Sequence, residues 1–317
     1  MRPFHRLPWL FAPVLLAAGC GPDTSPTAPA ADGTRPMQAV RAVTSAMLDE
    51  VNRRLEAAGA SYRAARAEMS LVSTAPAEMA SVVFANDRSL QFGVQWVDGD
   101  PRRPAGNTLR HYFYAPLAGV NSIAGVQDGR PQVAASFATW AGLSCAPLDF
   151  VQVPYDGTFP SGMFPGGDPT VGEVNTLGFL PGDYFDLLAP DGSDLILGAT
   201  FPFVWGDVDD DGNFIPSDID RDGNLDYAFA EVWYNNAFTW TLTGLGGDAD
   251  VQTVALHENG HTIGLGHFGK IHATFSPLGG RLHVSPRAVM NAIILGTLRV
   301  PLGTDVAALC GSYGPWP

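Results

Sequence analysis

The sequence predicts a mixed α/β fold of the α+β class. Helix-like and strand-like segments alternate irregularly along the 317 residues, without an internal repeat of about 20–50 residues. The chain contains 36 Gly and 26 Pro, which predicts many turns and loops rather than a helical bundle. Hydrophobic residues make up 46% of the chain and charged residues 16%, so the composition favours a folded core over widespread disorder.

The acidic composition restricts the partners. The chain has 18 Lys and Arg against 32 Asp and Glu, which gives a formal net charge of −14. Phosphate binding needs clustered cations, so this balance argues against nucleic acid as a partner. Three Cys are too few for a disulfide scaffold, and their odd number needs an explanation.

Residues 1–19 predict a secretory signal peptide. Arg2 and Arg6 form a positively charged start, and residues 7–18 form an apolar stretch that is too short to span a bilayer as a stable helix. The end of this stretch resembles a bacterial lipoprotein signal, in which Cys20 is lipidated. The alternative is a plain signal peptide that is cut near Ala18 and leaves Cys20 without a role. Both readings predict export. The protein is expected to be a cell-envelope lipoprotein, at the outer membrane or cell surface, or a secreted protein. Membrane contact is expected only through the lipid anchor.

The segment after the signal divides into a tether and an N-terminal unit. Residues 20–36 are rich in Pro, Ala and Thr and predict a flexible tether. Residues 37–105 follow as a unit that we expect to be propeptide-like or accessory. An amphipathic helix within residues 37–70 is predicted by apolar side chains at helical spacing, namely Val40, Val43, Met47, Leu48, Val51 and Leu55. Strands are expected over residues 81–84 and 90–97.

Residues 106–317 form the larger predicted unit. Its expected elements are strands over 109–114, 148–153, 195–201 and 228–234, and helices over 132–140, over 251–265 and from 304 onward. Asp248 or Asp250 is available as the N-cap of the second helix. The stretch 154–194 is rich in Gly, Pro and Asp and is expected to be mostly loop.

Three histidines and a glutamate form a zinc-binding pattern. His257 and His261 are four residues apart, so both imidazoles project from one face of a helix. Gly264 lets the chain leave the helix sharply, which allows His267 to return as a third ligand. Three imidazoles with one open position suit a catalytic Zn²⁺. Glu258 is then placed to act as general base on zinc-activated water during hydrolysis.

Two alternatives to a working zinc site stay open at this point. The histidines could sit at solvated or core positions of a purely structural helix. The chain could also be a decayed enzyme, although every residue that the pattern requires is present.

The spacing H-E-x-x-H-x-x-G-x-x-H resembles that of the metzincin zinc peptidases. Residues 285–291 resemble the Met-turn of this family, with Met290 beneath the zinc, whereas Met290 by itself reads as an ordinary core methionine. Residues 302–314 and 135–140 resemble the last and first helices of the matrixins, the matrix-metalloproteinase subgroup. The resemblance covers about residues 109–317.

The resemblance implies a zincin-like catalytic domain with a mostly parallel twisted sheet and three helices. It implies a zinc-dependent endopeptidase that hydrolyses peptide bonds of a protein or peptide substrate. Residues 197–200 would be the edge strand that pairs with an extended substrate, and Asp305 would support the Met-turn. The cysteine of the family's latency motif is absent, because no Cys lies between Cys20 and Cys145.

An acidic stretch at residues 207–226 predicts calcium binding. It holds eight Asp and one Arg, which is about half of the net charge. The spacing around Gly212 and Gly223 resembles that of calcium loops, with candidate ligands Asp207, Asp209, Asp211, Asp218, Asp220, Asp222 and Asp226. The alternative is a solvated acidic turn, but these carboxylates would repel one another without a cation. Bound Ca²⁺ would stabilise an insertion at about residues 202–227 without taking part in the chemistry.

Export also predicts a disulfide. An exported chain meets an oxidising compartment, so we expect Cys145 and Cys310 to pair.

A second function competes with the zinc peptidase. It is a calcium-binding surface lipoprotein with a decayed peptidase site, and it is motivated by the lipoprotein-like signal and the Asp-rich stretch.

Overall fold

The computed structural model describes residues 34–73, 93–103, 108–146, 148–168, 174–276 and 279–314. The predicted signal peptide, Cys20 and the strand expected over residues 81–84 lie outside the described residues. Among the helices of the described part, none is long and apolar enough to cross a membrane.

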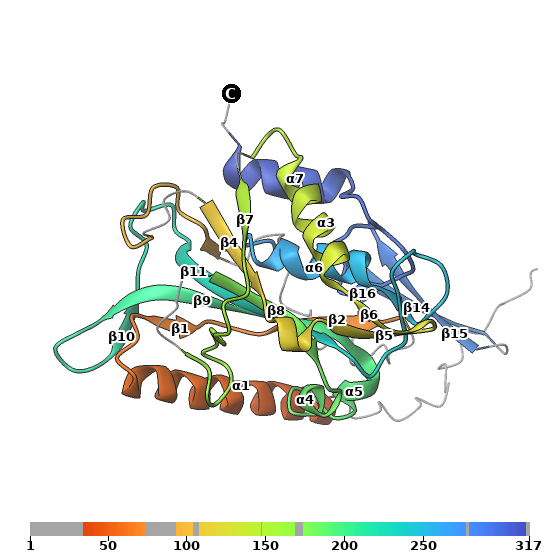
Figure 1. The fold of residues 1–317 in the computed structure, drawn as a ribbon, viewed down its shortest axis with the longest axis horizontal. Coiled ribbons are helices and arrows are strands. Elements are labelled where there is room, and N and C mark those ends of the chain that lie inside the picture. Colours follow the sequence, from red (N-terminus) through yellow and green to blue (C-terminus); the bar gives the residue numbers. More distant parts are fainter. Residues whose placement is uncertain are drawn as a thin grey trace, which may run out of the picture. The chain divides into compact units, whose positions relative to one another are not determined.

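A large mixed sheet forms the centre of the fold (Figure 1). Its strands follow the order β16-β2-β9-β11-β8-β4-β7, with β1 and β10 also paired to β9 and β3 paired to β11. The bounds are β1 Tyr62–Ala64, β2 Glu68–Val72, β3 Val94–Gln95, β4 Thr108–Phe113, β7 Asp149–Val153, β8 Val174–Leu180, β9 Ile196–Val208, β10 Phe214–Pro216, β11 Leu225–Asn235 and β16 Ile293–Ile294. Strands β11, β8, β4 and β7 are mutually parallel, whereas β9 is antiparallel to both β11 and β2.

Two smaller sheets complete the strand structure. One has the order β13-β12-β5-β6 and the other is the hairpin β14-β15. Their bounds are β5 Gly119–Ser122, β6 Gly125–Asp128, β12 Trp240–Thr241, β13 Ala249–Asp250, β14 Lys270–Ser276 and β15 Gly279–Ser285. The mixture of helices with several sheets confirms the predicted α+β class.

Helices cover both faces of the central sheet. Figure 1 shows α1 along one face and α3, α6 and α7 on the other. The bounds are α1 Thr34–Ala57, α3 Arg130–Ala141, α4 Asp183–Asp186, α5 Gly192–Leu195, α6 Val251–His261 and α7 Gly303–Tyr313, with a short 3-10 helix at Ala115–Leu117. On the α1 side, Val51 and Leu55 are buried in the same apolar cluster as Phe203 of β9. On the other side, the indole of Trp140 in α3 donates to the carbonyl of Leu256 in α6 at 2.9 Å.

The N-terminal segment is built into the central sheet. The helix expected within residues 37–70 ends at Ala57, where the left-handed Gly59 (φ +68°) turns the chain. Residues beyond this turn form β1 and β2, and both strands pair with β9. Residues 34–317 consequently form one compact unit. Whether residues 37–105 act as a propeptide-like or accessory part stays a prediction.

The stretch 154–194 is less irregular than its composition suggests. It contains β8, whose seven residues are all buried between β11 and β4. The polar Asn175 and Thr176 and the small Gly178 interrupt the apolar run, so the sequence predicts loop where this strand forms. Inside the sheet Asn175 accepts hydrogen bonds from the Tyr227 hydroxyl and the Ala230 amide, so its burial is compensated.

A disulfide joins Cys145, which follows α3, to Cys310 in α7. The two Cα atoms are 5.3 Å apart, within the range that a disulfide bridges. The bond closes a loop of 165 residues that contains the histidine-rich segment. It therefore ties the last helix to the end of α3.

A buried carboxyl group fixes the loop before β8. Glu231 on β11 is fully buried and accepts hydrogen bonds from the Ser161 hydroxyl at 2.7 Å and from the amides of Gly162 and Met163 at 2.6 and 3.0 Å. Burial raises the pKa of Glu231 to about 7, although these donors oppose the increase. The folded protein therefore binds a proton more tightly here than the unfolded chain does.

This carboxyl group predicts a pH-dependent stability. The contribution of protonated Glu231 is fully present below about pH 4.5 and is lost as the pH rises through about 7, so the free energy of unfolding falls by up to a few kcal/mol over that window. Glu231→Gln should remove this loss, measured by urea unfolding from pH 4.5 to 8. The exposed Glu56→Gln is the control, and equal pH slopes in both variants would contradict the prediction.

Candidate metal centre

Helix α6 carries the first two histidines of the zinc pattern. It starts after Asp250, whose side chain accepts a hydrogen bond from the Thr253 amide at 2.9 Å and so caps the helix. The sequence offers Asp248 and Asp250 as alternative N-caps, and the structure shows Asp250 at the N-cap. The helix ends at His261 rather than at residue 265.

A sharp turn returns the third histidine to the first two. Gly264 has φ +78°, and a Cβ atom there would collide with the carbonyl oxygen of Val94. Both the backbone conformation and the close approach therefore require glycine. After this turn His267 lies beside His257 and His261, as the spacing predicted.

The three imidazoles converge on one point. The Nε2 atoms of His257, His261 and His267 are 3.1–3.2 Å from one another, and the three residues are 0–2% exposed. The Nδ1 atom of His257 lies 2.8 Å from the Val289 carbonyl oxygen, and that of His261 lies 2.7 Å from the Leu265 carbonyl oxygen. A carbonyl only accepts, so both rings donate through Nδ1 and present an Nε2 lone pair to the centre.

This donor set fits a zinc ion. Burial, together with the neighbouring His267, lowers the pKa of His257 to about 3, and burial lowers that of His261 well below its ordinary value. The two rings are therefore neutral near pH 7, which is the form that binds metal. Three buried nitrogen donors with facing lone pairs are the ligand set of a catalytic zinc site, in which a fourth position stays open.

A carboxylate from the N-terminal segment lies behind the third histidine. The Oε2 atom of Glu68 in β2 is 3.0 Å from Nδ1 of His267, and Glu68 is 6% exposed. The same carboxylate also contacts Arg66 at 3.1 Å through Oε1. A carboxylate on the outer nitrogen of a ligating histidine orients the ring and raises its basicity.

Glu258, the predicted general base, is held by two hydroxyl groups. Ser70 of β2 donates to Oε1 at 2.5 Å, and Thr200 of β9 donates to Oε2 at 2.6 Å. Glu258 is fully buried. Burial raises its pKa to about 8, although both hydroxyl donors lower it.

Met290 lies beneath the histidine helix in a tightly packed turn. A Cβ atom on Gly260 would collide with the Met290 sulfur, so the glycine of α6 makes room for this side chain. Buried Asp305 of α7 accepts hydrogen bonds from the amides of Val289 and Met290 at 2.9 and 3.1 Å. This is the supporting contact that the family resemblance implied for Asp305.

The sequence does not mark Glu68 or Ser70 as site residues, and it places Thr200 only in the strand expected at residues 197–200. Glu68 and Ser70 lie in the N-terminal unit, within residues 37–70 where the sequence predicts a helix, so nothing in the histidine motif points to them. The available signals were Gly59, which stops α1, and the short apolar-polar alternation of β2.

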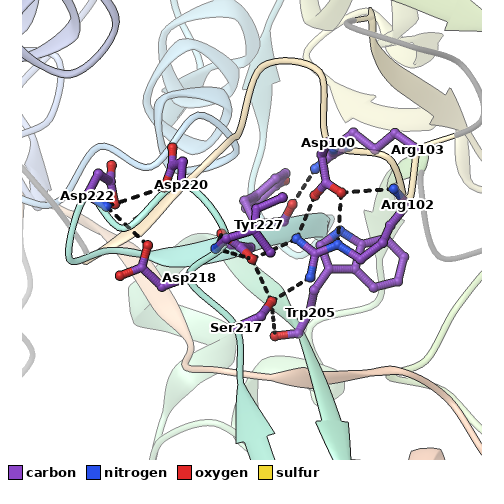
Figure 2. A network of polar contacts seen from close by, with 11 residues as sticks. Asp100, Arg102, Arg103, Trp205, Ser217, Asp218, Asp220, Asp222 and Tyr227 are labelled. Atoms are coloured by element: carbon purple, nitrogen blue, oxygen red, sulfur yellow. Dashed lines mark hydrogen bonds and ion pairs between the residues drawn. The ribbon is translucent and has the colours of Figure 1, made fainter.

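The Asp-rich stretch brings together only part of the predicted calcium ligands. Carboxylate oxygens of Asp218, Asp220 and Asp222 lie within 4.8 Å of one another (Figure 2). The Asp222 amide donates to Asp218 at 3.1 Å, which curls the loop around these groups. Burial together with repulsion from Asp222 raises the pKa of Asp220.

The remaining acidic residues have other positions. Asp209 accepts hydrogen bonds from the amides of Asp211 and Asn213, and Asp207 and Asp211 are exposed outside the cluster found among the described residues. Buried Asp226 pairs with Arg102 at 2.7 Å. Arg102 also pairs with Asp100 at 2.7 Å, as Figure 2 shows. Asp226 therefore anchors the 93–103 segment to β11.

Comparisons with known proteins identify no family. No protein-family model matches the chain, and no curated protein matches it. Among solved structures, the chain is similar to one described as the GM1 bound form of the ECX AB5 holotoxin, with 12% sequence identity and a TM-score of 0.32 over 66% of this chain and 81% of that chain. We draw nothing about fold or function from a similarity this weak.

The histidine geometry predicts zinc binding that depends on the triad. Purified protein dialysed against zinc-free buffer should retain about one zinc per chain, measured by mass spectrometry of the metal content. His261→Ala removes one of three nitrogen donors and should lower retained zinc to a small fraction of that. His283→Ala, an exposed histidine of the β14-β15 hairpin, is the matched control. Equal zinc in both variants would exclude the triad as the site.

Proposed function

We propose that this protein is an exported zinc-dependent endopeptidase of the matrixin-like metzincin type, either secreted or anchored at the cell surface. The observation that carries the proposal is the convergence of the Nε2 atoms of His257, His261 and His267 beside Glu258. Support also comes from Met290 packed against α6 and from Asp305 bonded to the turn that holds it. The substrate class is an extended protein or peptide chain.

The chain's own residues divide the work of hydrolysis. His257, His261 and His267 would hold the metal, and their outer nitrogens are fixed by carbonyl or carboxylate oxygens so that the rings do not rotate. Zinc bound there supplies a Lewis acid that polarises the scissile carbonyl and increases the acidity of water. A cation held by the three histidines would favour the ionised form of Glu258. In that form Glu258 takes the proton from the attacking water through a carboxylate oxygen and passes it to the leaving amine.

Thr200 positions Glu258 for this role. Its hydroxyl donates to Oε2 of Glu258 at 2.6 Å from the neighbouring strand β9. The carboxylate thereby keeps one oxygen bonded to the fold, and the other is available for proton transfer once its bond to Ser70 is broken. A group that is held by the scaffold acts without an additional entropic cost at the moment of reaction.

A calcium site in the Asp-rich loop is the second proposed metal site. The support is the close grouping of Asp218, Asp220 and Asp222, since Ca²⁺ prefers several carboxylate oxygens in a flexible loop. The role of a bound Ca²⁺ would be structural, because the ion would stabilise the loop between β9 and β11. The alternative function, a calcium-binding lipoprotein with a decayed peptidase site, is distinguished by the absence of zinc from the native protein.

The proposed activity predicts a strict requirement for Glu258. Glu258→Ala should lower casein hydrolysis by about 10²–10⁴-fold, because it removes the general base, while retained zinc stays at the level of the unchanged protein. The measurement is the release of casein fragments over an extended incubation, with and without 1,10-phenanthroline. Glu56→Ala, an exposed position on α1, is the control. Hydrolysis that survives the chelator or the loss of Glu258 contradicts the proposal.

The proposed calcium site predicts stabilisation by the free ion. Millimolar Ca²⁺ should raise the melting temperature by several degrees, because a ligand at about 100 times its Kd adds about 2.7 kcal/mol to the native state. Asp220→Asn should remove most of this increase, whereas Asp194→Asn, an exposed aspartate elsewhere, should leave it intact. An equal response in all three proteins places calcium stabilisation outside this loop.

A further inference from the structure

We infer that strand β2 occupies the groove in which an extended substrate binds, so that the intact chain is active only while β2 is transiently displaced. This inference rests on the proposed endopeptidase function. It assigns a specific inhibitory role to residues 68–72, which the sequence had placed only in a propeptide-like or accessory unit.

Both edges of β2 are paired, one with the strand that supplies Thr200 and the other with the strand that follows the Met290 turn. On one edge β2 is antiparallel to β9, with Ser70 opposite Gly198. On the other edge it is parallel to β16, and the Leu71 amide donates to the Ala292 carbonyl oxygen at 2.9 Å. Extended peptides are recognised by adding such a strand to an open sheet edge through backbone hydrogen bonds. The position beside β9 is already taken by this chain's own backbone.

Side chains of β2 also engage the chemical groups of the centre. The hydroxyl of Ser70 bonds to Glu258 at 2.5 Å, and the carboxylate of Glu68 lies 3.0 Å from His267. One short strand thus holds the proposed general base and one proposed ligand together.

The centre is closed to a substrate in this arrangement. Glu258 and the three histidines are 0–2% exposed, so a peptide bond cannot reach them without a rearrangement. Buried Met69 and Leu71 fix β2 in place, since both belong to the main apolar cluster. Displacement of β2 frees the β9 edge, the β16 edge and one oxygen of Glu258 together.

The test measures how fast a probe enters the centre of the zinc-loaded full chain. The probe is a fluorescent pentapeptide hydroxamate, which combines an extended backbone with a zinc-chelating group. Because β2 must leave first, we expect the association rate to reach a plateau as the probe concentration rises. Leu71→Pro removes the hydrogen bond to Ala292 and should increase this rate at least about tenfold. Ala64→Pro, in β1 away from the centre, is the matched control and should change it little.

A disulfide lock tests the same idea without weakening the fold. Val72 and Ile294 are partners in the β2-β16 ladder, where neighbouring strands lie within disulfide range. In the double variant Val72→Cys and Ile294→Cys, oxidation should abolish probe binding and casein hydrolysis, and reduction should restore both. The unchanged protein in the same reductant is the control.

The outcomes separate this inference from the proposed function. If the oxidised lock binds the probe and cleaves casein as fast as its reduced form, β2 does not fill the groove, while the peptidase function stands. If the zinc-loaded protein and every folded variant neither bind the probe nor cleave casein, the peptidase function fails and the inference fails with it. Blocked binding in the oxidised form alone supports the inference.

Discussion

The fixed orientation of three buried imidazoles is the constraint on which the rest of the centre depends. The lone pairs of His257 and His261 face each other at 3.1 Å because carbonyl oxygens take the protons on their outer nitrogens. One of these carbonyls belongs to Val289, and the amide of Val289 is in turn bonded to Asp305 of α7. The orientation of a metal ligand is thus set by the last helix of the chain, which the disulfide at Cys310 ties to the end of α3.

Strand β9 connects the parts of the molecule that the sequence seemed to separate. Its 13 residues pair with β11 on one side and with the N-terminal strands β1 and β2. The same strand supplies Thr200, which holds Glu258. Strand β9 positions the proposed base and also pairs with β2, the segment that covers the base. Access to the centre and the chemistry of the centre therefore depend on the same strand. This coupling follows from ordinary sheet pairing and needs no additional domain.

The local features of the fold and of the centre were predictable, whereas their long-range partners were not. The spacing of His257, His261 and His267 determines a shared face and a return turn, so local geometry alone predicts the triad. The sequence does not predict strand β8, because Asn175 and Gly178 break its apolar run and the burial of Asn175 depends on partners far away in the sequence. The contacts of Glu68 and Ser70 span almost 200 residues, and no periodicity encodes them. The spacing of the Asp-rich stretch predicts calcium ligands around both Gly212 and Gly223, yet Asp226 forms an ion pair and the close cluster holds Asp218, Asp220 and Asp222.

The placement of β2 within the same polypeptide has a consequence for concentration. A segment tethered to its own binding groove acts at an effective concentration that reaches the millimolar range for short flexible links, independent of how dilute the protein is. A free substrate at micromolar concentration competes poorly with such a neighbour. Breaking one peptide bond between the segment and the rest of the chain turns the contact into a bimolecular one, which dilution then weakens. After such a cut, the extent to which β2 closes the centre would depend on how dilute the protein is.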